Sequence, residues 1–227
     1  MRCVILQPSY IPWRGYFDLI RRADVFVFYD DVQYDKHGWR NRNRIKTPQG
    51  TQWITIPVRS KSNVVQGLSI GEVRIAGNHW EQKHRRTLTQ NYRSAPFFDD
   101  EILNEIYDDP PELLCELTIR STIALARRLG YTNTQFFRSS DFGFKDGRTD
   151  RLIAILRHLG ATEYLSGPSA SDYIDQTKFD SARIKLEWIQ YDYPEYPQLY
   201  PPFDPLVSII DLMFMTGPDA ARFISRI

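Results

Sequence analysis

Residues 2–29 of the chain read RCVILQPSYIPWRGYFDLIRRADVFVFY and place one amphipathic segment between two apolar runs. The runs Cys3 to Leu6 and Ala23 to Tyr29 are short and contain β-branched residues, as buried strands do. Between them, residues 7–15 hold two prolines and a glycine, which predict a loop, and Tyr16 to Arg22 has the apolar spacing of a helix. This order is a βαβ unit and predicts a parallel sheet with a ligand site at the strand ends.

The rest of the chain continues this mixture of short strands and helices. A hairpin is expected over residues 39–58, and a helical lobe within about 79–130. Strands are expected at 136–139, 162–165 and 184–191, with helices at 149–159 and 206–215. We therefore predict one α/β domain over residues 1–227, built on a small, mainly parallel, Rossmann-like sheet with a helical lobe.

The composition excludes several classes of protein. With 29 Lys and Arg against 28 Asp and Glu, the net charge is +1, so a nucleic-acid partner is not expected. The two cysteines, Cys3 and Cys115, form no CxxC motif, which argues against a disulfide scaffold or a metal site and suits a reducing compartment. No apolar run approaches the ~18–20 residues of a membrane span, and the N-terminus lacks a signal-peptide pattern. We expect a cytoplasmic protein.

The loop after the first predicted strand is the first candidate site. In doubly wound folds the carboxyl ends of the strands face the ligand, and this loop carries Gln7, Tyr10, Trp13 and Arg14. The helix that follows would offer backbone N–H groups to an anion. The alternative is a tight proline-rich turn whose aromatic residues are simply buried.

A basic stretch, WRNRNRIK at residues 39–46, is the second candidate. In an extended strand, Arg40, Arg42 and Arg44 lie on one side, and Asn41 and Asn43 lie on the other. Like charges on one face repel, and an anion that neutralises them would make the arrangement acceptable, since arginine binds phosphate or carboxylate through paired hydrogen bonds. The stretch therefore predicts a small, phosphate-bearing substrate. The alternative is a solvated edge strand whose charges prevent aggregation.

Polar residues further along the chain suggest acid–base and anion-binding roles. His79 and His84 are five residues apart, a spacing that does not suit a zinc helix, but imidazole titrates near neutral pH and suits proton transfer. Asp150 would support this role, Arg151 would bind the anion, and Ser166 opens a turn with free N–H groups. The alternative is plain helix capping and packing. The chain lacks the GxGxxG, GxxxxGK[ST], GxSxG and HExxH motifs, which removes the common enzyme classes that carry them.

Several long stretches together resemble the WbqC-like protein family. They are QPSYIPWRGYFDLI (7–20), FYDDVQYDKHGWRNRNRIKTPQG (28–50), HWEQKHRRTLTQNYRSAPFF (79–98), GRTDRLIAILRHLGATEYLSGPSASDYID (147–175) and YPQLYPPFDPLVSIIDLMFMTGPDA (196–220). Members of that family are typically encoded among genes for bacterial surface polysaccharides such as O-antigen. The resemblance implies decoration of a sugar, for example by amino-acyl or acyl transfer to an amino sugar.

The opening unit is also similar to the first βαβ unit of HIGH-type nucleotidyltransferases and pantoate ligases. Those enzymes place a pair of histidines in the first loop, where this chain has Tyr10 and Tyr16. Since a tyrosine is neutral at pH 7, this resemblance bears on the fold and not on adenylyl transfer.

Two functions follow from these observations. One is a transferase that acts on an activated anionic donor, such as a nucleotide-linked sugar. The other is a non-catalytic binding or scaffold protein in a polysaccharide assembly complex. The sequence names no cofactor and leaves a homo-oligomer open. Convergence of the candidate residues in one cleft would favour the enzyme.

Overall fold

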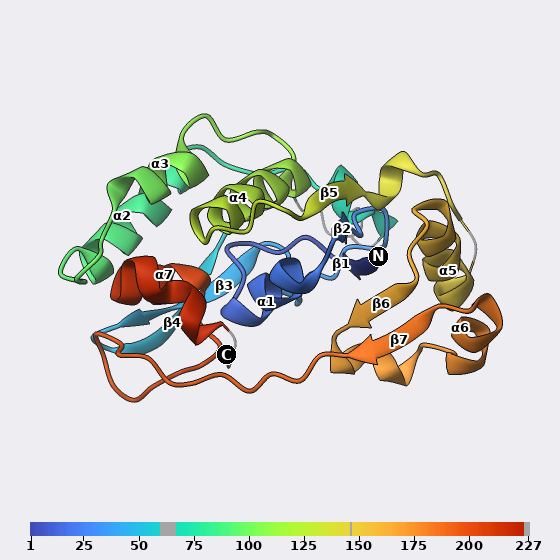
Figure 1. Ribbon diagram of the computed structural model, residues 1–227. Coiled ribbons are helices and arrows are strands. Elements are labelled where there is room, and N and C mark those ends of the chain that lie inside the picture. The colour runs from blue at the N-terminus through green and yellow to red at the C-terminus, as the bar shows by residue number, and fades with distance from the viewer. Residues whose placement is uncertain (60–66, 146, 225–227) are drawn as a thin grey trace.

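Five parallel strands form the central sheet of the protein (Figure 1). The computed structural model describes residues 1–59, 67–145 and 147–224. The strands are β1 (Arg2–Leu6), β2 (Val25–Phe28), β5 (Gln135–Arg138), β6 (Glu163–Ser166) and β7 (Lys185–Trp188). The predicted α/β class with a small parallel sheet is therefore confirmed.

The sheet has the strand order β5-β2-β1-β6-β7. From β1 the chain moves outward through β2 to β5, and it then crosses back to β6 and moves outward the other way to β7. The order thus reverses between β1 and β6. In open parallel sheets such a reversal leaves a crevice at the carboxyl ends of the two strands, where ligands bind.

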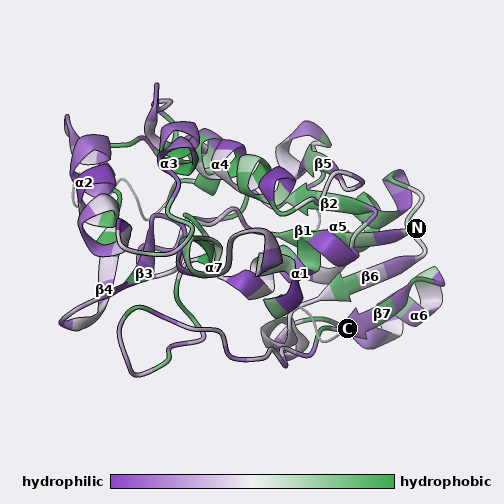
Figure 2. Ribbon diagram, turned by 60° about the vertical axis from the view of Figure 1, so that its left-hand side comes forward, coloured by the Kyte–Doolittle hydropathy of each residue, from purple (hydrophilic) through white to green (hydrophobic). Residues whose placement is uncertain are grey.

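The central strands bury both of their faces. Val4 and Phe26 belong to a core shared with helices α1 and α4, whereas Cys3 and Val25 belong to a core shared with α5 and α6. Because successive side chains of a strand point to opposite faces, a strand between two helical layers is apolar at every position. This explains why residues 3–6 of β1 and 25–28 of β2 are continuously apolar, in agreement with the position of β1 between helices in Figure 2.

Apart from α6, at whose position no helix is predicted, the α-helices of the described residues lie close to their predicted positions. They are α1 (Arg14–Arg22), α2 (Trp80–Tyr92), α3 (Asp100–Tyr107), α4 (Leu114–Arg128), α5 (Arg148–His158), α6 (Gln176–Ala182) and α7 (Ile209–Thr216). α2, α3 and α4 occupy the segment predicted as a helical lobe, and α4 also packs on the sheet core. Within the described residues, no helix is both long and apolar enough to cross a membrane.

A separate antiparallel hairpin stands beside the sheet, formed by β3 (Arg42–Thr47) and β4 (Gly50–Thr55). Asn43 and Ile45 are buried, while Arg42 and Arg44 are half-buried, so the predicted alternation holds over these four residues; it ends at Lys46, which is buried as well. Residues 189–208 then connect β7 to α7 in a long irregular segment that crosses the molecule toward this hairpin (Figure 1).

Two buried polar groups hold this long segment in place. The Arg14 side chain donates to the carbonyl oxygens of Pro194, at 2.7 Å, and Phe223, at 3.1 Å, and its guanidinium lies 5.0 Å from the ring centre of Tyr193. The fully buried Asp211 accepts hydrogen bonds from the hydroxyl of Tyr196 and, as described below, from two further donors. Buried polar groups with these partners fix the path of a segment that has no regular secondary structure.

We predict that Phe26→Ala lowers the free energy of unfolding by about 3–5 kcal/mol, since it leaves a cavity in the core. Phe26 is fully buried and contacts the rings of Tyr16 and Phe28. Urea unfolding measures the loss. Phe97→Ala is the matched control, because the Phe97 side chain is 47% exposed. An equal loss in both variants would contradict the assignment of Phe26 to the core.

Candidate functional site

A cleft of about 410 Å³ opens where the strand order reverses. Leu6 ends β1 on one side of it, and the turn at 167–169 follows β6 on the other. The remaining walls come from the first loop, the start of the hairpin and the long segment before α7. They contribute Ser9, Pro12, Trp13, Tyr16, Leu19, Trp39, Arg40, Asn43, Tyr191 and Leu206. The predicted loop after the first strand is thus part of a real cleft.

Arg40 is the single charged residue among the described residues that line this cleft. Its Nη1 donates to the carbonyl oxygen of Pro8 at 3.2 Å, and across the described parts of the chain no carboxylate forms an ion pair with it. Burial lowers the pKa of the Arg40 guanidinium, and the nearby Tyr16 and Asp35 act against this effect. A cation removed from water without a counter-charge is costly, so this position favours the binding of an anion.

Aromatic side chains line the cleft together with Arg40. Trp13 packs edge-on against Tyr191 with ring centres 4.9 Å apart, and Trp39 is a further lining residue. The indole of Trp13 folds over the first turn of α1, where a Cβ on Gly15 would lie 2.3 Å from the ring. Glycine at position 15 therefore permits this wall. α1 begins at Arg14, two residues before its predicted start.

The first loop is held in an unusual conformation. Ile11 has φ of 33°, which is rare for a β-branched residue. Its carbonyl oxygen accepts hydrogen bonds from Nδ2 of Asn43 and from Oγ of Ser208, both at 2.8 Å. Strain that is fixed by partners from distant parts of the chain is typical of functional sites.

The other members of the basic stretch do not converge on the cleft. Arg42 stacks on Trp53 at 4.5 Å from the ring centre and donates to the carbonyl oxygen of His37. Arg44 pairs with Asp204 at 3.4 Å. Arg42 and Arg44 therefore lie on one face of β3 as predicted, each with its own partner, whereas Arg40 precedes the strand and lines the cleft.

Tyr10 and the two asparagines are structural. The Nδ2 of Asn41 donates to the carbonyl oxygen of Ile56 at 2.8 Å, and Asn43 ties the first loop to the hairpin as described. Tyr10 is fully buried, and its hydroxyl bonds to His84 and Tyr107. Tyr10 thus belongs to the buried structure that supports the first loop. Asn43 bonds to this loop and also lines the cleft.

The buried His84 is held through both of its ring nitrogens. Nε2 lies 3.1 Å from the carbonyl oxygen of Thr55, and Nδ1 lies 2.9 Å from the hydroxyl of Tyr10. Because a carbonyl only accepts, Nε2 carries the hydrogen and Nδ1 accepts one. Burial lowers the pKa of His84 to about 4. The structure therefore gives His84 a structural role in place of the predicted acid–base role.

The remaining predicted residues lie apart from the cleft. His79 is exposed at the start of α2 and borders a separate shallow hollow. Asp150 pairs with Lys178 at 2.6 Å on the surface. Ser166 is buried at the end of β6, next to the cleft turn, and Gln7 accepts a hydrogen bond from Tyr16 through its carbonyl oxygen. The structure does not bring His79, His84 and Asp150 together.

A second polar cluster lies at the carboxyl ends of β2 and β5, where the predicted anion ligand Arg151 pairs with Asp31. Beside it, Asp30 accepts from Nε of Arg138 at 2.7 Å and from Oγ of Ser140 at 2.9 Å. Burial acts to raise the pKa of Asp30, but Arg138 and Ser140 outweigh it and hold the pKa below its usual value. Asp30 and Asp31 are not among the predicted site residues, although carboxylates that follow closely after an apolar strand are a signal for a site at the strand ends.

We predict that His84 stabilises the fold above about pH 6.5 and that this contribution falls as the pH drops toward 4. In this pH range the imidazole of His84 binds a proton in the unfolded state but not in the folded state. The contribution amounts to roughly 3 kcal/mol over the whole range, of which roughly 2 kcal/mol is lost between pH 7.5 and 5. Urea unfolding between pH 7.5 and 5 measures it, with His84→Gln losing this part of the pH dependence and His37→Gln, an exposed control, keeping it. Protonation of His84 near pH 6.5 in the folded protein, seen by NMR, would contradict the prediction.

Comparison with known proteins places the chain in a family. A model of the WbqC-like protein family matches residues 7–223. The uncharacterized protein Rv1507c of Mycobacterium tuberculosis (strain ATCC 25618 / H37Rv) is 44% identical over 227 residues, which cover 98% of this chain and 97% of that protein. No solved structure matches the chain. The family model includes the first loop, the hairpin and the long segment that together build the cleft, and the chain belongs to the WbqC-like protein family.

Proposed function

We propose that the protein is a transferase of bacterial surface polysaccharide biosynthesis and that the cleft at β1 and β6 binds its activated anionic donor. A nucleotide-linked sugar and an acyl donor both fit this description. The observation that carries the proposal is Arg40, which has no ion pair among the described residues and lines an aromatic cleft at the point where the strand order reverses. Membership of the WbqC-like family supports the link to polysaccharides.

The cleft is suited to a donor with one anionic group and a largely apolar or ring-shaped remainder. Leu6, Leu19 and Pro12 add to the aromatic walls, and ligand pockets combine such apolar surface with a few polar groups that fix orientation. The guanidinium of Arg40 would bind a phosphate or carboxylate through two parallel hydrogen bonds. A donor held in this way leaves its anionic end at Arg40.

In the proposed reaction, Arg40 stabilises the charge that develops on the leaving group. The acceptor oxygen or nitrogen forms the new bond to the transferred group, and the bond from that group to the anionic leaving group breaks. No Asp, Glu, His, Lys or Cys is found among the described residues that line the cleft, so the acceptor's proton passes to the leaving group or to water. Catalysis then depends mainly on positioning and on charge.

The same observation favours a second candidate function. A cleft whose lining, in the described residues, holds no Asp, Glu, His, Lys or Cys also suits a protein that binds an anionic precursor and presents it to a partner enzyme. In that case the ligand binds and is recovered unchanged.

We predict that Arg40→Gln removes the binding of the donor. A thermal-shift panel of nucleotide sugars and acyl-coenzyme A identifies the donor, since a ligand at ~100 times its Kd adds about 2.7 kcal/mol. For a chain of this length that stabilisation raises Tm by roughly 5–10 °C. Arg40→Gln should abolish the shift because the anion loses its counter-charge.

Arg157→Gln is the matched control, because Arg157 is exposed in the last turn of α5, toward the opposite edge of the sheet. Mass spectrometry after incubation of the donor with an amino sugar separates the two candidates, as only a transferase forms a new product. A panel without any shift, or a shift that Arg40→Gln retains, would overturn the assignment of the cleft.

A further inference from the structure

We propose that the exposed pair Trp39–Trp53, together with Arg42, is a binding site for an anionic saccharide. These three residues are called the tryptophan platform below. The proposal rests on the proposed function, because it assigns the platform to the acceptor while the cleft holds the donor.

The platform is a pair of contacting indole rings that remain open to solvent. The ring centres of Trp39 and Trp53 are 5.0 Å apart, with the planes inclined by 40°. Their side chains are nevertheless 40% and 49% exposed. Exposed apolar surface is unfavourable in water, and a ligand that covers both rings would remove it from the solvent.

The size of the platform argues for a small ligand. A tryptophan side chain buries at most about 250 Å², so two half-exposed rings offer roughly 200 Å². A specific protein–protein interface needs about 800 Å² from each partner. A pyranose ring, by contrast, matches one indole face with its row of C–H groups and turns its hydroxyl groups outward to polar neighbours.

Arg42 determines the charge of the expected ligand. Its guanidinium stacks on Trp53 at 4.5 Å and donates to the carbonyl oxygen of His37. Arg44 on the same face is paired with Asp204, but over the described stretches of the chain no carboxylate forms an ion pair with Arg42. A guanidinium that is spread on an aromatic ring keeps its outer N–H groups available for a carboxylate or phosphate.

The platform is continuous with the cleft. Trp39 belongs to both, since it lines the cleft and contacts Trp53. Arg40 follows it directly in the chain and serves the donor, while Arg42 lies on the outer face of the hairpin. A saccharide stacked on the platform would therefore reach the mouth of the cleft, where an acceptor group has to meet the donor.

The test measures binding of acidic oligosaccharides by calorimetry. The probes are hexagalacturonate, a hyaluronate hexamer and a phosphorylated oligomannose, with maltohexaose as the neutral probe. We expect at least one acidic probe to bind about tenfold more tightly than maltohexaose, as a charge-assisted contact provides. Trp53→Ala should weaken it about tenfold, and Arg42→Gln should remove the preference for acidic probes.

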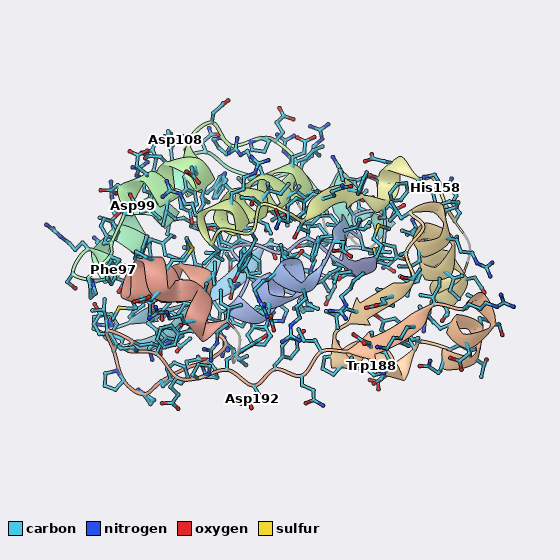
Figure 3. All side chains as sticks on the ribbon, in the orientation of Figure 1. Phe97, Asp99, Asp108, His158, Trp188 and Asp192 are labelled. Atoms are coloured by element: carbon cyan, nitrogen blue, oxygen red, sulfur yellow. The ribbon has the colours of Figure 1, made fainter. Side chains whose placement is uncertain are left out.

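Trp188→Ala is the matched control, since Trp188 is another exposed tryptophan (36%) on β7, at the far end of the molecule from the hairpin (Figures 1 and 3). The thermal stability of each variant, without ligand, shows that it is folded. Absence of binding by all three acidic probes, or equal effects of Trp53→Ala and Trp188→Ala, would overturn the proposal.

Two further arms separate the proposal from its alternatives and from the function of the cleft. Tighter binding of a short single-stranded RNA, with the same dependence on Trp53, would replace the saccharide by a nucleic acid.

If Arg40→Gln abolishes donor binding while Trp53→Ala leaves the acidic probes bound, the platform fails and the cleft assignment stands. If Trp53→Ala weakens the acidic probes while Arg40→Gln leaves the donor panel unchanged, the cleft assignment fails and the saccharide site stands.

Discussion

The reversal of strand order between β1 and β6 is the constraint on which the site depends. Helices α1 and α4 cover one face of the sheet, and α5 and α6 cover the other. Because the chain leaves β1 and β6 in opposite directions, neither connection closes the space above their carboxyl ends. That space is then lined by segments from four distant parts of the sequence, and each of them adds to the cleft around Arg40.

The basic hairpin shows how the protein resolves repulsion between like charges. Arg44 is neutralised by Asp204, and Arg42 spreads on Trp53. Arg40 donates to the carbonyl oxygen of Pro8, and within the described residues it forms no ion pair, while burial lowers the pKa of its guanidinium. The electrostatic cost is thus concentrated on one guanidinium, which is the arrangement that a bound anion relieves most effectively.

The sequence predicts the sheet well, because its apolar runs and helix boundaries are local signals. The convergence of distant segments on the cleft cannot be predicted from such local signals. Tyr191 and Leu206 reach the cleft from more than 180 residues beyond Leu6, and no local pattern reports such contacts. His79 and His84 suggested a pair, yet five positions on a helix differ by about 140°, and His79 itself lies outside α2 with a positive φ of 62°. The spacing of five residues therefore already indicates that His79 and His84 do not lie on the same face of a helix.

The irregular segment at 189–208 gives the cleft a wall that depends on buried polar groups far from the ligand. Tyr191 and Leu206 line the cleft, and the path between them is fixed where Asp211 accepts from Tyr92, Tyr196 and Gln198. Burial raises the pKa of Asp211 to about 6, whereas these donors favour its ionised form. An irregular segment has no regular backbone hydrogen bonds that would fix its path. The shape of the cleft therefore depends on this network of buried hydrogen bonds. A change in the network alters ligand binding although none of its residues contacts the ligand.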